Sequence, residues 1–302
     1  MLIAIVLSVL AGGLIPVQTA INSRLSGRLG AVLPASLVSF AVGSVGLGLA
    51  VLATGTSVPW AETAATQPWW IWVGGVCGLV FLTLNIVLLP RIGAAATVVL
   101  PLVGQVLGGL VIDLAGAFDT AVRPLTVVRG LGGGLVVLGA ALVNLVGGRA
   151  AVAAGHARPH PVLWVVGVLA GTLGAVQTAV NGRLAEVMGS GLASALVSFL
   201  VGTVGLVLVN LAFRQRVRQV SGVRPWMLVG GLMGATFVLV NAVNAPILGT
   251  SLAVSAALLG QVLVGLLIDH GGHLGITRRP VTAARLLGAL LVIAGVVLVR
   301  LG

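Results

Sequence analysis

The sequence predicts an all-α membrane protein with ten transmembrane helices, arranged as two inverted five-helix repeats. Its 302 residues are 59% hydrophobic and only 7% charged, with a mean hydropathy of +1.22. Soluble domains carry about 25% charged residues, so this chain could not cover itself with polar surface in water. The apolar stretches run roughly 20 residues, the length that a helix needs to cross the hydrocarbon core of a bilayer.

The third observation is that the chain repeats itself. Residues Gln18–Leu25 read QTAINSRL, and Gln177–Leu184, 159 residues later, read QTAVNGRL. The run GQVL at Gly104 likewise returns at Gly260. Each copy holds five apolar segments, and because five is odd, a second copy joined directly to the first must be inverted in the bilayer. The copies are predicted at 1–148 and 162–302, with 149–161 as the linker.

In the first copy, helices are predicted at 2–22, 33–53, 69–89, 94–114 and 126–146. The first is a retained helix and not a signal peptide, because no basic residue precedes it and its continuation recurs in mid-chain. Charged and turn-forming residues separate the helices. These breaks fall at Arg24–Gly30, Thr54–Pro68, Pro90-Arg91 and Asp119–Pro124.

In the second copy, helices are predicted at 162–181, 192–213, 226–245, 251–269 and 283–301. The breaks between them are Arg183–Gly191, Arg214–Arg224, Pro246–Thr250 and His270–Pro280. All 6 tryptophans of the chain lie in loops or near a predicted helix end. Trp prefers that interfacial depth because its ring is apolar and its N–H group is polar, so the tryptophans support these boundaries.

The charge distribution predicts the orientation. The net charge of +11 comes from 16 arginines, since the chain has no lysine. Most arginines fall on the side reached after the odd-numbered helices, namely Arg24, Arg28, Arg91, Arg149, Arg158, Arg214, Arg216, Arg218, Arg224, Arg278, Arg279 and Arg285. The other side holds Arg123, Arg129, Arg183 and Arg300. The bias predicts both termini outside the cytoplasm and the linker inside. Arginines dispersed between apolar runs favour this anchoring role, so no nucleic-acid partner is predicted.

Polar side chains inside the predicted spans are the candidate substrate-binding residues, because a polar group in hydrocarbon is costly. They recur in both copies: Gln18, Asn22, Asn85 and Gln105 in the first, and Gln177, Asn181, Asn241, Asn244 and Gln261 in the second. One interpretation is a cavity near the middle of the membrane, lined by these amides. The other is structural, since buried amides also join helices by hydrogen bonds worth about 1 kcal/mol each.

Asp113 and Asp269 are the one acidic pair that the two copies share, each near the end of a helix. One hypothesis is a coupling or gating carboxylate, paired with an arginine such as Arg129 or Arg285 in a closed state. The alternative is a helix-end carboxylate that binds backbone N–H groups of the following loop.

Signatures of enzymes and cofactors are absent from the sequence. The lone Cys77 allows no internal disulfide, and no Cys/His spacing typical of zinc occurs. The glycine-rich run 130–134 lacks the preceding strand and the lysine of a phosphate-binding loop. Neither a cofactor, a metal nor an enzymatic activity is predicted. The expected partners are a small-molecule substrate and the lipid bilayer, with a homodimer as an alternative to the monomer.

At the repeated runs QTAxNxRL, LVSF and GQVL…D, the chain resembles the drug/metabolite transporter superfamily, in its EamA-like part. The likeness is closest to the YdcZ-like branch in its fused two-by-five-helix form. The resemblance implies a ten-helix fold, a substrate path between the halves and a location in the bacterial inner membrane. Small multidrug exporters of this superfamily carry a glutamate in the first helix, where this chain has Gln18 and Gln177. An amide cannot titrate, which leaves Asp113 and Asp269 as the candidate proton carriers.

The function predicted from the sequence is that of a secondary transporter for a small metabolite, working by alternating access in the direction of export. A channel is one alternative, because a pore needs no buried coupling carboxylate. A membrane subunit without transport activity is the other.

Overall fold

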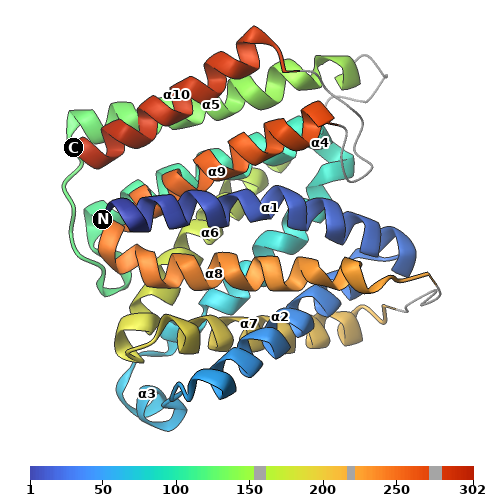
Figure 1. The fold of residues 1–302 in the computed structure, drawn as a ribbon, viewed down its shortest axis with the longest axis vertical. Coiled ribbons are helices and arrows are strands. Elements are labelled where there is room, and N and C mark those ends of the chain that lie inside the picture. Colours follow the sequence, from blue (N-terminus) through green and yellow to red (C-terminus); the bar gives the residue numbers. More distant parts are fainter. Residues whose placement is uncertain (153–160, 216–221, 272–280) are drawn as a thin grey trace.

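The computed structural model describes the backbone of residues 1–152, 161–215, 222–271 and 281–302, and within its helices it leaves out the side chains of 85–87, 89–99, 144–152 and 269. Every element in this part of the chain is a helix (Figure 1). The α-helices are α1 Leu2–Leu29, α2 Val32–Thr54, α3 Trp60–Thr66, α4 Gly74–Ala115, α5 Val127–Val152, α6 Pro161–Val187, α7 Gly191–Ala212, α8 Val229–Leu248, α9 Thr250–Gly271 and α10 Ala283–Leu301. Short 3-10 helices cover η1 Trp69–Trp72, η2 Ala117–Asp119 and η3 Pro225–Leu228.

The first helix is longer than predicted. α1 continues through the expected break at Arg24–Gly30 and ends at Leu29, followed by Gly30 in the left-handed conformation with φ 70°. Basic residues near a helix C-terminus interact favourably with its dipole, so Arg24 and Arg28 do not end the helix. The glycine, which accepts a positive φ without steric cost, ends it instead. The loop predicted at Thr54–Pro68 also differs, because it contains the short helix α3.

α4 spans 42 residues, Gly74–Ala115, and includes Pro90-Arg91, where the sequence predicted a break between two helices. A straight helix of that length would measure about 63 Å. Both of its ends nevertheless lie at the same end of the molecule (Figure 1), where Gly74 contacts Asn181 of α6 and Gly109 contacts Ser251 in the first turn of α9. The parts 74–84 and 100–115, whose side chains the structure describes, therefore run in opposite directions.

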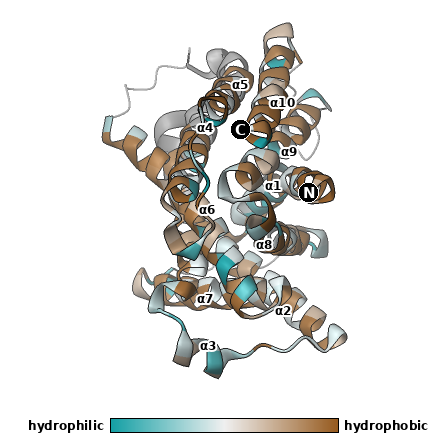
Figure 2. Cartoon of the chain, turned by 90° about the vertical axis from the view of Figure 1, so that its left-hand side faces the viewer, coloured by the Kyte–Doolittle hydropathy of each residue, from teal (hydrophilic) through white to brown (hydrophobic). Residues whose placement is uncertain are grey.

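The helices form three groups along the long axis of Figure 1. α5 and α10 pair at one edge, α2 and α7 at the other, and α1, α4, α6, α8 and α9 fill the middle (Figures 1 and 2). The first helix of each sequence copy packs mainly against helices of the other copy. α1 contacts α8 and α9 of the second copy, and α6 contacts α4 of the first copy as well as α8 of its own. The two copies are therefore interlocked and do not stand side by side.

Glycines bring the central helices into backbone contact. A Cβ atom at Gly260 of α9 would overlap the carbonyl oxygen of Val9 in α1, and one at Gly104 of α4 would overlap that of Val168 in α6. These are matching positions of the two copies. Small residues at such crossings allow a close approach of helices that no hydrophobic force drives together within lipid.

The two edge pairs repeat their contacts in the same reciprocal way. In α2 and α7 the rings of Phe40 and Phe199 stack with centroids 4.9 Å apart, and each ring covers a glycine of the opposite helix, Gly202 or Gly43. In α5 and α10, Gly132 faces Gly295 and Gly139 faces Gly288. A contact made by one copy is thus made again by the other with the roles exchanged.

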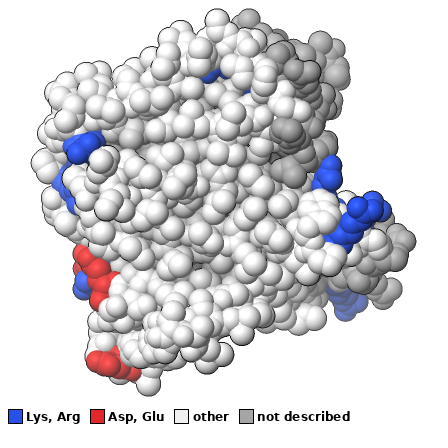
Figure 3. Space-filling model, viewed as in Figure 1, with Lys and Arg blue, Asp and Glu red and all other residues white. Residues whose placement is uncertain are grey.

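The surface is that of a membrane-spanning bundle. Seven helices in the described residues are long and apolar enough to cross a bilayer, and three shorter apolar helices, Gly74–Leu84, Leu100–Ala115 and Val127–Val143, accompany them. The helices are largely apolar along their length (Figure 2), and many of their large apolar side chains are exposed. The charges visible in Figure 3 lie mainly at the left and right sides of the view, where the helices end. Both chain termini lie at the left-hand end of the helices (Figure 1).

Candidate functional site

Two of the predicted asparagines join neighbouring helices. The Nδ2 atom of Asn22 in α1 donates to Ser39 Oγ in α2 over 3.2 Å, and that of Asn181 in α6 donates to Ser198 Oγ in α7 over 3.1 Å. The Oδ1 atom of each asparagine is buried, accepts no hydrogen bond from a described residue and lies against a glycine of a third helix. Such a close glycine offers its Cα–H group as a weak donor. These amides therefore hold helices together, as the structural interpretation predicted.

The asparagines of α8 are also engaged. Asn244 donates to Ala4 O over 2.8 Å and to Ser8 Oγ over 2.9 Å, which ties α8 to α1. Asn241 donates to Phe237 O in its own helix, and its Oδ1 atom is buried without a partner in the described residues. The side chain of Asn85, the counterpart of Asn241, lies outside the described part of the chain.

The four predicted glutamines differ from the asparagines. Gln18, Gln105, Gln177 and Gln261 are all half-buried, and none has a side-chain hydrogen bond to a residue that the structure describes. Their amide atoms are not sealed off, in contrast to the buried Oδ1 atoms of the asparagines. An unpaired amide inside a membrane protein is costly unless water or a solute reaches it. The glutamines therefore differ from the asparagines, because their polar atoms are neither bonded to a described residue nor fully enclosed.

The glutamines lie in two matching places. Gln177 of α6 lies against Gly78 of α4, and Gln18 of α1 lies against Gly234 of α8. The side chain of Gln105 in α4 packs against Gly174, one helical turn before Gln177. The structure thus brings Gln105 and Gln177 to one stretch of α6.

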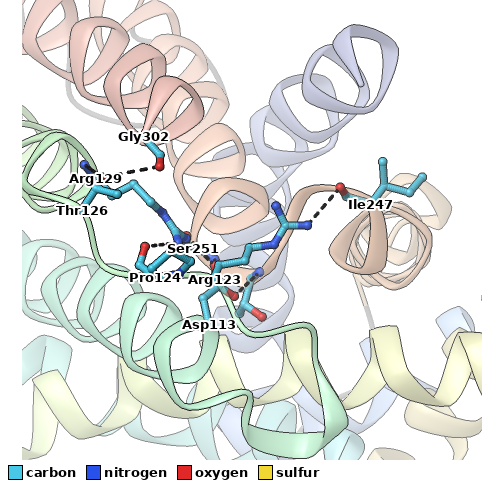
Figure 4. Close-up of polar contacts among 9 residues, drawn as sticks. Asp113, Arg123, Pro124, Thr126, Arg129, Ile247, Ser251 and Gly302 are labelled. Carbon is cyan, nitrogen blue, oxygen red and sulfur yellow. Dashed lines mark hydrogen bonds and ion pairs between the residues drawn. The ribbon is translucent and has the colours of Figure 1, made fainter.

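Asp113 lies in a buried ionic cluster at the end of α4 (Figure 4). Its Oδ2 atom is 2.8 Å from Nη2 of Arg129, and the two residues are 0% and 5% exposed. The carboxylate also accepts hydrogen bonds from the backbone N–H groups of Thr250 and Ser251, at 2.7 and 3.1 Å, and from Ser251 Oγ at 2.6 Å. Arg129 in turn donates to Ser251 Oγ and to Pro124 O. Every polar atom of the carboxylate is satisfied.

This cluster places a negative charge at the N-terminus of α9, where the helix dipole stabilises it. Asp113 pairs with Arg129, and it also binds backbone N–H groups as the second hypothesis expected. The expectation that those N–H groups belong to the following loop was wrong, since they come from α9 of the second copy. Asp113 therefore links the two halves of the molecule.

Residues that the sequence did not single out complete this end. Arg123 donates its backbone N–H to Asp113 O over 2.7 Å and its Nη2 to Ile247 O at the end of α8 over 3.3 Å. Gly249, with φ 80°, lies against Arg123 and Asp113, so that a side chain would not fit. The proline-glycine break before Thr250 indicated a junction between helices in the sequence. It did not predict that Asp113 of the first copy binds there.

The second copy differs at the corresponding positions. The side chain of Asp269 lies outside the described residues, while Arg285 is buried and donates from Nε to Val143 O over 3.1 Å. The positions that match Thr250 and Ser251 are Ala94 and Ala95 in the sequence, so no hydroxyl is available there.

A surface cavity of about 310 Å³ lies away from all of these amides. It is lined by Pro59, Glu62, Thr63, Thr66, Gln67, Arg183, Glu186 and Val187, which come from the α3 region and the end of α6. The sequence analysis did not predict it, because its walls come from two helices far apart in the sequence, α3 and α6.

A family described as "Putative inner membrane exporter, YdcZ" matches residues 3–142 and 162–298 of the chain. The gap between the two matched segments contains the predicted linker. No curated protein sequence matches the chain. Among solved structures, one titled "Crystal structure of protein" aligns with a TM-score of 0.71 at 17% identity, covering 99% of this chain and 96% of that one. At that identity the likeness shows a common fold.

Proposed function

Because the chain belongs to this family of inner membrane exporters, we propose that it is a secondary transporter that moves a small metabolite outward by alternating access. The observation that carries the proposal is the set of four half-buried glutamine amides with no hydrogen bond to any described residue. They provide donors and acceptors for a neutral or zwitterionic solute that has lost its water. Asn22, Asn181 and Asn244 act as fixed ties around them, while Asn85 and Asn241 keep the role predicted from the sequence.

The proposed architecture is ten spans in two inverted repeats, with α4 supplying two of them. The reciprocal contacts of α2 with α7 and of α5 with α10 support it, because they relate the copies by a twofold exchange. Rocking one half against the other would then expose the glutamines to each side in turn.

We place both termini outside the cytoplasm, on the basis of the arginine bias. The Asp113 cluster lies beside the C-terminus, since Thr126, three residues before Arg129, donates to Gly302 O over 3.5 Å. In this orientation the cluster closes the outer end, and it must open for the solute to leave. Asp269 has the corresponding role at the inner end.

The direct test is flux in proteoliposomes with a panel of neutral and zwitterionic metabolites. We expect saturable flux that shows counterflow, and its loss in the variant Gln105→Leu/Gln261→Leu with unchanged thermal stability. Conductance without saturation would indicate a channel. A double variant that loses stability, in a protein without flux under any gradient, would indicate a subunit and refute transport.

A further inference from the structure

A small crevice lies near the Asp113 cluster, at the end of the molecule that carries the termini. Its walls come from three places, namely the loop after η2, the last turns of α6 and the junction of α8 with α9. Its volume is about 40 Å³, and none of the glutamines proposed for the transport path lines it. A ligand bound there would be separate from that path.

Two arginines line this crevice, Arg123 from the loop and Arg183 from α6. In Arg123, Nη2 donates to Ile247 O over 3.3 Å (Figure 4), while Nε and Nη1 have no acceptor among the described residues. In Arg183, Nη1 donates to Glu186 over 3.3 Å, while Nε and Nη2 donate to no described residue. Each Nε is enclosed by protein, whereas the other unpaired nitrogen is not. Both side chains therefore bring unused N–H donors to one crevice.

The ion pairs around the crevice are distributed unevenly. Arg183 is near two carboxylates, Glu186 at 3.3 Å and Asp119 at 3.8 Å. Arg123 forms no ion pair with any residue that the structure describes, and the nearby carboxylate of Asp113 is already satisfied by other donors. A half-buried guanidinium without a counter-charge is costly, and an anion in the crevice would offset that cost.

The donors and the size of the crevice define the chemistry of the ligand. A guanidinium offers only N–H donors, so the ligand must supply acceptor oxygens, and a carboxylate is the group that matches it best. One water needs about 10–15 Å³ of such space, so about 40 Å³ holds a group of roughly three heavy atoms, as in a carboxylate. A phosphate is larger, and its second negative charge would be repelled by Glu186 in the wall.

The surroundings leave a carboxylate room to enter. Arg183 and Glu186 also line the 310 Å³ surface cavity, so the two spaces adjoin. A Cβ atom at Gly249 would lie 2.6 Å from Nε of Arg123, so the glycine keeps the space beside the guanidinium free. Apolar side chains such as that of Ala245 complete the wall and can contact the carbon chain of an acid.

We propose that this crevice binds the carboxylate group of a small organic acid. Arg123 supplies the unpaired charge, and Arg183 supplies further N–H donors. Because Arg123 also ties the loop of the first copy to Ile247 of α8, the acid would bind directly beside a contact between the two copies.

Saturation-transfer NMR on the full-length protein in phosphatidylcholine nanodiscs tests the site with propionate at pH 7, where this acid is ionised. Propionamide is the neutral analogue, and inorganic phosphate is the competitor. We expect saturable binding of propionate that salt weakens, no binding of propionamide and no displacement by phosphate at matched ionic strength. Arg123→Gln should weaken propionate binding about tenfold or more, the effect of losing a charged hydrogen bond. Arg300→Gln, which removes an exposed cation close to the C-terminus, is the matched control and should leave it unchanged.

Glu186→Gln should have the opposite effect. It removes the carboxylate that competes for Arg183, so propionate binding should become stronger, a result that damage to the fold would not produce. Absent propionate binding, equal binding of propionamide, displacement by phosphate, equal losses in Arg123→Gln and Arg300→Gln, or weaker binding in Glu186→Gln would each overturn the site. The variant Gln105→Leu/Gln261→Leu should bind propionate as the unmodified protein does, so this proposal and the transport proposal fail separately.

Discussion

Among single substitutions, the largest loss of stability is predicted at Asp113. Asp113→Asn would leave the Arg129 guanidinium buried without its counter-charge, and breaking a buried pair in this way costs about 3–5 kcal/mol. We expect a clear fall in the thermal unfolding temperature of the purified protein. Asp119→Asn is the matched control, because that carboxylate is exposed and 3.8 Å from its arginine. Similar falls for both variants would contradict the assignment of the cluster.

The division between asparagines and glutamines can be tested within a single helical turn of α6. Asn181→Ala removes the bond to Ser198 and should lower stability by about 1 kcal/mol. Gln177→Leu removes an amide without a described partner, so it should leave stability unchanged and abolish flux in proteoliposomes. The division fails if Gln177→Leu destabilises the protein as much as Asn181→Ala does.

At this scale the sequence identified the polar residues within apolar segments, but it did not predict the partners that they have in the structure. The repeated amides and the Asp113–Arg129 pair follow from polar residues within apolar segments. The difference between bonded asparagines and free glutamines depends on glycines and serines of other helices, which one sequence does not place. The cavity at Glu62 depends on α3 meeting the end of α6, and no periodicity predicts that contact.

Helix crossings in the centre of the molecule depend on single glycines. Gly260→Ala would push α9 away from Val9 of α1 and should cost about 1–3 kcal/mol, typical of overpacking. Gly265→Ala on the same helix has open space around its new methyl group and should be neutral or slightly stabilising. Unfolding temperatures of the two variants provide the comparison, and equal values would argue against the backbone contact.

Most helices could be predicted from the apolar stretches, to within a few residues at many ends. The errors have local causes. α1 runs past two arginines because basic residues suit a helix C-terminus, and α4 keeps helical backbone through the predicted break while its two described parts run in opposite directions. α3 was not predicted, since its seven residues carry no detectable period.

At the scale of the whole molecule, the orientation in the membrane is predicted from the distribution of the arginines alone. Single cysteines introduced near each terminus of a Cys77→Ser background should react with a membrane-impermeant maleimide in intact cells. A cysteine introduced at position 155 in the linker should react only after lysis. Labelling of just one terminus in intact cells would contradict an even number of spans.

The interlocked packing has a consequence for biosynthesis. When the ribosome has finished α1, the helices that will cover it, α8 and α9, have not yet been translated, so the first half must wait in the membrane with an unfilled surface. We expect residues 1–152 expressed alone to be degraded, and to be rescued by residues 161–302 supplied from a second gene. Neither half is expected to fold stably in the membrane before the other half has been inserted.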